Sequence, residues 1–245
     1  FPQKLDTLPA NVTAVAQTGV DNINNIEQVV IDNPGAGNYT IAVKGTAIAQ
    51  NPRQDYFITY DFVPVSVTVT YPTGAESFVN SENVLITWDA FGENDKTFTV
   101  EYTLDNGVNW IVINNNVAPT LRQLLWTTPT GIQTKDARIR ITRNGTALVN
   151  TGNYFTIINT PVFNFSGVQC EGYININWAS VPGATGYDIL LFRKDSMQVV
   201  ATVGSNVNDY VISGVSKDSL YWVSMRARLQ DGVGQRLSGK CHTSR

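Results

Sequence analysis

The sequence predicts an all-β chain built from tandem β-sandwiches. Apolar and polar residues alternate with a period of two through most of the chain, and no stretch has a convincing helical period of 3.6. Charged residues make up only 15% of the 245 residues, while Asn, Gly, Thr and β-branched residues are plentiful. This composition is typical of half-buried strands joined by polar turns, and the length suits two or three small domains.

Net charge and hydropathy argue against nucleic acid as a partner and against a membrane span. A net charge of −3 gives no electrostatic basis for binding nucleic acid. No apolar run is long enough to span a bilayer, so no membrane span is predicted. The first residues, Phe1-Pro-Gln-Lys4, lack the apolar segment of a signal peptide. We therefore expect either a mature product or an excised fragment.

Residues 160–245 carry the clearest pattern. The alternation predicts seven strands, over residues 163–170, 173–178, 187–193, 197–203, 209–212, 220–229 and 235–241. A Pro182-Gly183 turn follows Trp178, and Tyr221 opens a late strand six residues after Val215. These features resemble a fibronectin type III module. The resemblance implies that the Tyr221 hydroxyl bonds back to the turn at Val215, and that the module spaces, presents or binds rather than catalyses.

The two cysteines, Cys170 and Cys241, both lie in this last segment. In a fibronectin-like topology the first and last strands run the same way, so both cysteines would fall at the same pole of the sandwich. We therefore predict a disulfide between them, which would close a long loop and imply an oxidising, extracytoplasmic setting. The alternative is two buried thiols that act as small apolar side chains.

Residues 64–159 repeat this plan and predict an Ig-like sandwich. Strands are expected over residues 65–71, 83–88, 98–104, 108–113, 123–127, 137–142 and 148–158. The turn at Asp105-Asn106-Gly107 is a strong hairpin signal, because Asn and Gly tolerate positive φ. Alternation also places Trp88 and Trp126 in the core of this sandwich, as it places Trp178 in the core of the next.

Residues 1–63 are different, because only three strands are expected, over residues 25–31, 38–46 and 55–62, with a turn at 33–37. Three strands rich in Ile, Val, Tyr and Phe cannot bury both of their faces unaided. The segment is therefore interpreted as the C-terminal part of a jelly-roll-like sandwich. Its opening strands would lie upstream or be supplied by another chain.

The order of motifs along the chain carries a further resemblance. The runs Asp21-Asn-Ile-Asn-Asn-Ile-Glu-Gln-Val-Val-Ile31 and Asn33-Pro-Gly-Ala-Gly-Asn-Tyr-Thr-Ile41 resemble the closing strands of the jelly-roll domain that follows the catalytic unit in secreted bacterial subtilisin-like serine peptidases. That domain is akin to the P-domain of proprotein convertases. Tyr71-Pro-Thr-Gly-Ala-Glu-Ser77 and Asp105-Asn-Gly-Val-Asn-Trp110 resemble the Ig-like domain that often comes next. The order implies the accessory tail of a secreted, multidomain bacterial protein.

No catalytic constellation is found in the sequence, so the chain is not predicted to be an enzyme. Its single histidine, His242, is three residues from the end and is expected to be a solvated tail residue. The paired carboxylates Glu93 with Asp95, and Asp188 with Asp195, are expected on turns and strand edges without a cleft between them.

No cofactor is predicted, although calcium is the only one for which the sequence offers candidate ligands. Asp21, Asn22, Asn24, Asn25 and Glu27 place hard oxygen ligands within seven residues, and calcium takes six to eight such oxygens. The spacing is not that of an EF-hand. Asn- and Asp-rich loops are also ordinary turn chemistry, which remains the alternative.

Trp110 and Trp222 are the two tryptophans not assigned to a core. Trp222 follows the inward-facing Tyr221 and should point outward, where it would stack on a sugar, pack between domains or cover Arg side chains. Arg138, Arg140 and Arg143 form a basic stripe on the middle domain, interpreted as a solvated strand face or as a site for an acidic ligand.

The leading functional hypothesis is a non-catalytic accessory tail of a secreted or cell-surface peptidase-like protein, which spaces, stabilises or presents the catalytic part. Its partners would be the remainder of the parent protein, above all the strands that complete residues 1–63, and a protein or glycan ligand. The alternative hypothesis is an adhesin or glycan-binding β-sandwich array.

Overall fold

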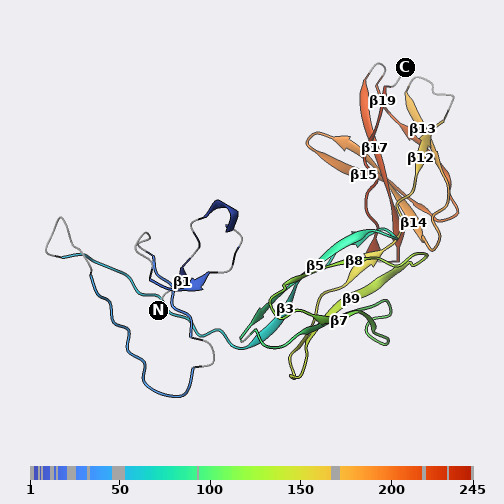
Figure 1. Cartoon of the computed structure of the whole chain (residues 1–245). Coiled ribbons are helices and arrows are strands. Elements are labelled where there is room, and N and C mark those ends of the chain that lie inside the picture. The colour runs from blue at the N-terminus through green and yellow to red at the C-terminus, as the bar shows by residue number, and fades with distance from the viewer. Residues whose placement is uncertain are drawn as a thin grey trace. The chain divides into compact units, whose positions relative to one another are not determined.

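The computed structural model describes residues 3–4, 6, 8–11, 14, 16–20, 26–31, 34–45, 53–92, 94–166, 172–216, 219–230 and 232–243 (Figure 1). The chain divides into two compact units, Phe1–Pro64 and Val65–Arg245. The fold is nearly all β, with one 3-10 helix of three residues in the described part of the chain, which confirms the all-β prediction. Among the described residues, no helix is long and apolar enough to cross a membrane.

Among the described residues of the first unit, paired strands occur only near its beginning. Strands β1 (Gln3–Lys4) and β2 (Gln17–Thr18) pair antiparallel, and the 3-10 helix η1 (Pro9–Asn11) lies between them in sequence. The described parts of the three expected strands, residues 26–31, 38–45 and 55–62, do not form strands. A strand needs a neighbouring backbone to bond its N–H and C=O groups, and no described residue pairs with these segments.

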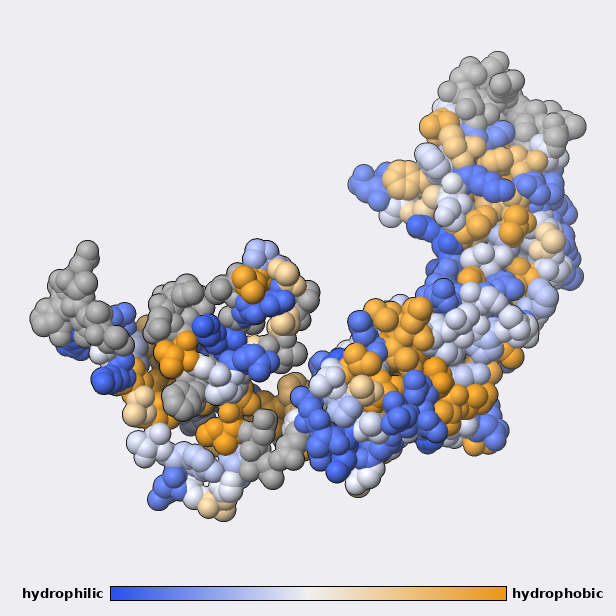
Figure 2. Space-filling view, viewed as in Figure 1, coloured by the Kyte–Doolittle hydropathy of each residue, from blue (hydrophilic) through white to orange (hydrophobic). Residues whose placement is uncertain are grey.

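These unpaired segments expose large apolar side chains, which Figure 2 shows as hydrophobic surface on this unit. Phe57 is 98% exposed, Ile26 is 83% exposed, and Phe62 is 80% exposed. Exposed aromatic and aliphatic residues at this density are unusual for a chain that has completed its core.

The middle sandwich, from Val65, consists of two sheets. One has the order β3-β5-β8, and the other β4-β11-β9-β6-β7, with β10 paired to β9. Their bounds are β3 (Ser66–Tyr71), β4 (Ser77–Phe78), β5 (Asn83–Phe91), β6 (Phe98–Thr103), β7 (Ile111–Val117), β8 (Gln123–Thr127), β9 (Thr134–Arg143), β10 (Val149–Thr151) and β11 (Phe155–Ile157). Both sheets contribute to one core, in which Trp88 and Trp126 are buried as predicted. Asn106 and Gly107 have φ of 60° and 87°, as the hairpin signal requires.

The last sandwich has the sheets β12-β13-β16 and β15-β14-β17-β18, with β19 paired to β17. Their bounds are β12 (Phe163–Phe165), β13 (Tyr173–Trp178), β14 (Gly186–Arg193), β15 (Ser196–Gly204), β16 (Asp209–Ser213), β17 (Leu220–Leu229), β18 (Gly232–Val233) and β19 (Lys240–Thr243). Trp178 is buried in its core, as predicted. The Ser216 backbone N–H donates to the Tyr221 hydroxyl at 2.7 Å, which confirms the tyrosine corner.

The two sandwiches meet within a single peptide unit. Ile157 is fully buried in the core of the middle sandwich, and the next residue, Ile158, is fully buried in the core of the last one. Successive side chains of an extended chain point in opposite directions, so these neighbours enter different cores. Nearby, the Gln235 side-chain amide donates to both carboxylate oxygens of Glu82 at 2.9 and 3.1 Å.

Candidate functional site

A candidate surface site lies on the outer face of the sheet β15-β14-β17. The β14–β15 hairpin places Phe192 directly opposite Met197. The β14–β17 register pairs Leu191 with Val223, so Trp222 lies beside Phe192. Phe192 is 44% exposed and Trp222 is 45% exposed. The three side chains therefore form an apolar row across three strands, called here the Met197–Phe192–Trp222 row.

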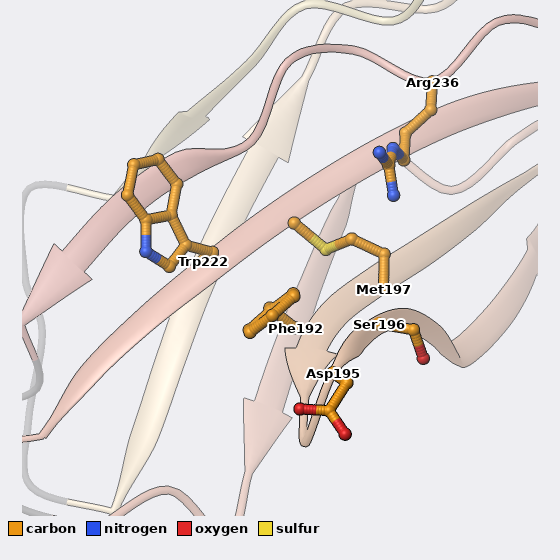
Figure 3. A pocket seen from close by; sticks show the side chains of 6 residues that line it. All are labelled: Phe192, Asp195, Ser196, Met197, Trp222 and Arg236. Carbon is orange, nitrogen blue, oxygen red and sulfur yellow. The ribbon is translucent and has the colours of Figure 1, made fainter.

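This row lines an open hollow of about 490 Å³ (Figure 3). Asp195 and Ser196, from the hairpin turn, and Arg236 complete its lining, so charges of both signs border an apolar floor. The backbone of Gly239 lies under the row, because a Cβ there would be 3.0 Å from Met197 Cε and 3.4 Å from Trp222 Cε3. Glycine at this position lets both side chains lie close to the sheet.

A buried carboxylate lies further along the same face. Asp188 is 1% exposed, and Arg226 Nε donates to its Oδ2 at 2.8 Å. Arg228 Nη1 donates to both of its oxygens at 3.1 and 3.2 Å, and the Thr202 hydroxyl donates at 2.8 Å. Burial opposes the charged form, but the hydrogen bonds from Thr202, Arg226 and Arg228 outweigh it and hold the pKa of Asp188 below its ordinary value.

These contacts make Asp188 a structural anion rather than half of a catalytic pair. Asp195 lies at the hairpin turn beyond the far end of β14, so the structure does not bring the two carboxylates together. For the other pair considered, Asp95 is 3.6 Å from Arg143, and Glu93 lies outside the described residues. Among the described residues, no group of three His, Cys, Asp or Glu could hold a metal ion.

The middle sandwich carries a second aromatic surface, on the outer face of β9. The guanidinium of Arg140 lies 4.1 Å from the ring centre of Trp110 and bonds Glu101 at 2.8 Å. Arg138 lies 4.6 Å from the ring centre of Tyr154. Trp110 thus covers an Arg side chain of its own sandwich, which is one of the roles considered for an outward tryptophan.

Arg143 does not belong to the predicted basic stripe. It is 5% exposed, and its Nη1 donates to the Phe91 carbonyl at 3.0 Å. Alternation along β9 turns Arg138 and Arg140 outward, while Arg143 shares the inward face with Ile139 and Ile141. The prediction of a basic stripe of three arginines is therefore wrong, because only two of them lie on the outer face.

The predicted calcium ligands Asp21, Asn22, Asn24 and Asn25 lie outside the described residues, and Glu27 is exposed on an extended segment. The calcium site stays a prediction. Cys170 also lies outside the described residues, while Cys241 is an exposed, free cysteine on β19 opposite Trp222, so the structure gives the disulfide no support. The disulfide therefore stays a prediction as well.

The expectation of a solvated His242 is wrong. The residue pairs with Tyr221 in the sheet, and its ring lies 4.6 Å from that of Phe165. The prediction failed because residues near a terminus were assumed to be solvated, whereas β19 includes His242.

Sequence reasoning found Trp222 but missed its neighbours Phe192, Met197 and Arg236. A signal for two of them was present, since closing the hairpin at Arg193 and Ser196 places residues 192 and 197 opposite each other. Arg236 falls in the expected strand 235–241, but the structure has no strand over residues 234–239 and β19 begins only at Lys240, so the alternation expected there did not place it.

No protein-family profile matches the chain, and no curated protein matches it. Among solved structures, it is similar to a two-domain fibronectin type III segment of chicken tenascin, with 11% identity over 74% of this chain and 99% of that chain and a TM-score of 0.41. It is similar to the FN1-FN3 domains of chicken CNTN1, with 15% identity, 74% of this chain and a TM-score of 0.33, and it spans 65% of that chain. It is also similar to FN3tt, with 20% identity over 36% of this chain and 96% of that chain and a TM-score of 0.32. These neighbours are fibronectin type III domains, and the all-β architecture itself rests on the strands and cores described above.

Proposed function

We propose that this chain is a non-catalytic accessory region of a secreted, peptidase-like protein, in which β-sandwiches space and present the catalytic part. The observation that carries the proposal is the junction at Ile157 and Ile158, where two cores adjoin without an intervening linker. A spacer needs such a junction, because a flexible linker would let the presented part move independently.

The exposed apolar segments of the first unit support a second part of this proposal. Phe57, Tyr60 and Phe62 lie on an extended segment without strand partners among the described residues. Extended segments with alternating apolar residues are stabilised when further strands pair with them and cover their apolar side chains. In the proposal, those strands come from the remainder of the parent protein, as the jelly-roll resemblance implies.

Hydrogen exchange tests this completion. Backbone amides of residues 26–31, 38–45 and 55–62 are measured in this chain alone and in the parent polypeptide, with β5 as the internal control. We expect slow exchange in the three segments only in the parent, and unchanged exchange in β5. Equally fast exchange in both proteins would contradict the proposal.

The secreted or cell-surface location is proposed together with the Cys170–Cys241 disulfide, since such bonds persist in oxidising compartments. Thiol titration of the denatured, unreduced protein should find no free thiol, and reduction should release two. Two thiols before reduction would contradict the disulfide.

A second candidate function, glycan or protein binding in an adhesin-like array, is favoured by one observation. Trp222 is half-exposed in a hollow with apolar and charged borders, whereas Trp110 is already stacked on Arg140. A glycan array is the test. Specific binding that Trp222→Ala abolishes and Trp110→Ala preserves would support this function, and absence of binding to any glycan would remove the glycan form of it.

A further inference from the structure

Strand β15 leaves one side of its sheet open. It ends the order β15-β14-β17-β18, so alternate N–H and C=O groups of its backbone face away from β14. With nine residues it is the longest strand at a sheet edge in the described part of the chain. A long open edge is a template for pairing with another strand.

The sequence of β15 has none of the side chains that usually prevent such pairing. From Ser196 to Gly204 it reads Ser-Met-Gln-Val-Val-Ala-Thr-Val-Gly, with no charged residue and no proline. One register shift, between Ile189 and Leu190 of β14, makes Val200 an extra residue. Regular pairing with β14 continues on both sides of it, so the strand remains an extended edge.

Hollows border β15 on both of its faces. The first, of about 490 Å³, contains Met197 and the rest of the apolar row. The second, of about 300 Å³, lies between β15 and the edge strand β16, and includes Val199, Val200, Tyr210 and Ile212. Side chains of an added strand point alternately to the two faces of a sheet. Both sets of side chains on a strand added to β15 would therefore find room.

The charges at the two ends of this edge select the partner. Arg193, Lys194 and Asp195 lie before β15 and together carry one net positive charge, two cations less one anion, and Asp209 begins β16 shortly after β15 ends. If two copies pair antiparallel, the cationic end of one β15 lies beside the acidic end of the other. A second copy of this chain thus offers an uncharged strand with complementary charges at both ends.

We propose that β15 pairs antiparallel with β15 of a second copy about a two-fold axis, which joins the two β15-β14-β17 sheets into one. The interface is isologous, so the same residues contribute from both copies and the assembly closes as a dimer. It would cover Met197 on the outer face, and the second hollow, which Val199 and Val200 line, on the other.

Sedimentation equilibrium of the full chain tests the proposal with two matched variants. Val199→Lys places a charge on the proposed interface, while Val211→Lys places the same charge on β16. Both valines are 46% exposed. We expect a monomer–dimer equilibrium that Val199→Lys weakens roughly tenfold or more and Val211→Lys leaves unchanged. A monomer at all concentrations, or association that Val199→Lys does not alter, overturns the proposal. The second result is expected if association instead proceeds through residues 26–62.

Charge reversal provides a second test, which does not depend on the folding of the Val199→Lys variant. Arg193→Glu and Asp209→Lys should each weaken the dimer, because each creates like charges across the interface. The double variant should restore much of the lost affinity. Equal dimerisation in all three variants, or additive weakening in the double variant, would show that these ends do not meet.

Discussion

Asp188 keeps a negative charge on a side chain that is almost fully removed from water. Two guanidinium groups and one hydroxyl bond its oxygens, and all three lie on strands adjacent to β14. The group therefore links β14 to both β15 and β17, the strands that carry the Met197–Phe192–Trp222 row. Its contribution to folding depends on both the presence of the carboxylate and its charge.

Removing this carboxylate should destabilise the last sandwich. We expect Asp188→Ala to lower the free energy of unfolding by about 2–3 kcal/mol, because it leaves Arg226 and Arg228 without their anion. The cost is below that of a fully buried pair, since both guanidinium groups retain contact with water. Urea denaturation followed by tryptophan fluorescence measures it. Asp195→Ala, at the hairpin turn, is the control and should change stability by less than about 0.5 kcal/mol.

The charge of Asp188 should also make stability depend on pH. Its pKa is lower in the folded state than the ordinary value of 3.8, so its stabilisation is complete above that value and is lost as pH falls through the folded pKa. The stability difference between wild type and Asp188→Asn should stay constant above about pH 5 and shrink below about pH 4. Asp105, whose pKa is lowered to about 2 by hydrogen bonds from Asn109 and Thr103, contributes to both proteins alike. A difference that grows on acidification would contradict this account.

For single residues, the sequence correctly predicted which side chains are buried wherever burial follows from alternation along a strand. Trp88, Trp126 and Trp178 follow that pattern and are buried. Arg143 and Asp188 are charged residues at buried positions, and their partners lie far away in sequence. Alternation could not show that Phe91 or Arg226 would be available to them, so these contacts could not be predicted.

At the scale of elements, the turn before β17 depends on one hydroxyl. Tyr221→Phe removes the acceptor of the Ser216 N–H and should lower the free energy of unfolding by about 1 kcal/mol. Thermal denaturation of both proteins measures the difference. Tyr210→Phe is a matched control, because the Tyr210 hydroxyl makes no hydrogen bond within the described residues, and a loss equal to that of Tyr221→Phe would contradict the assignment.

Most strands of residues 65–245 could be predicted because each has a partner within the same chain. The expected strand 148–158 divides into β10 and β11, which both pair with β9, and the register is irregular within β11. Residues 55–62 have an equally strong strand pattern but form no strand. The alternation of apolar and polar residues indicates which side chains can be buried on one face. Strand formation also requires a second backbone to pair with, which alternation does not reveal.

At the scale of the whole molecule, Ile157 and Ile158 offer a paired test of how the sandwiches are joined. Each substitution to Ala should destabilise by about 2–4 kcal/mol, since each removes a fully buried side chain. Ile157→Ala should increase hydrogen exchange mainly in β5 and β9, and Ile158→Ala mainly in β13 and β14. Identical exchange patterns in the two variants would mean that residues 65–245 unfold as one cooperative body.

The peptide bond between Ile157 and Ile158 also has a mechanical consequence. Under tension along the polypeptide, no linker between the sandwiches would extend first. A force applied to one sandwich would therefore act directly on the other. Stretching a single molecule held at residues 65 and 243 should therefore give no compliant phase before the first rupture. Placing a few glycines at this bond should introduce one.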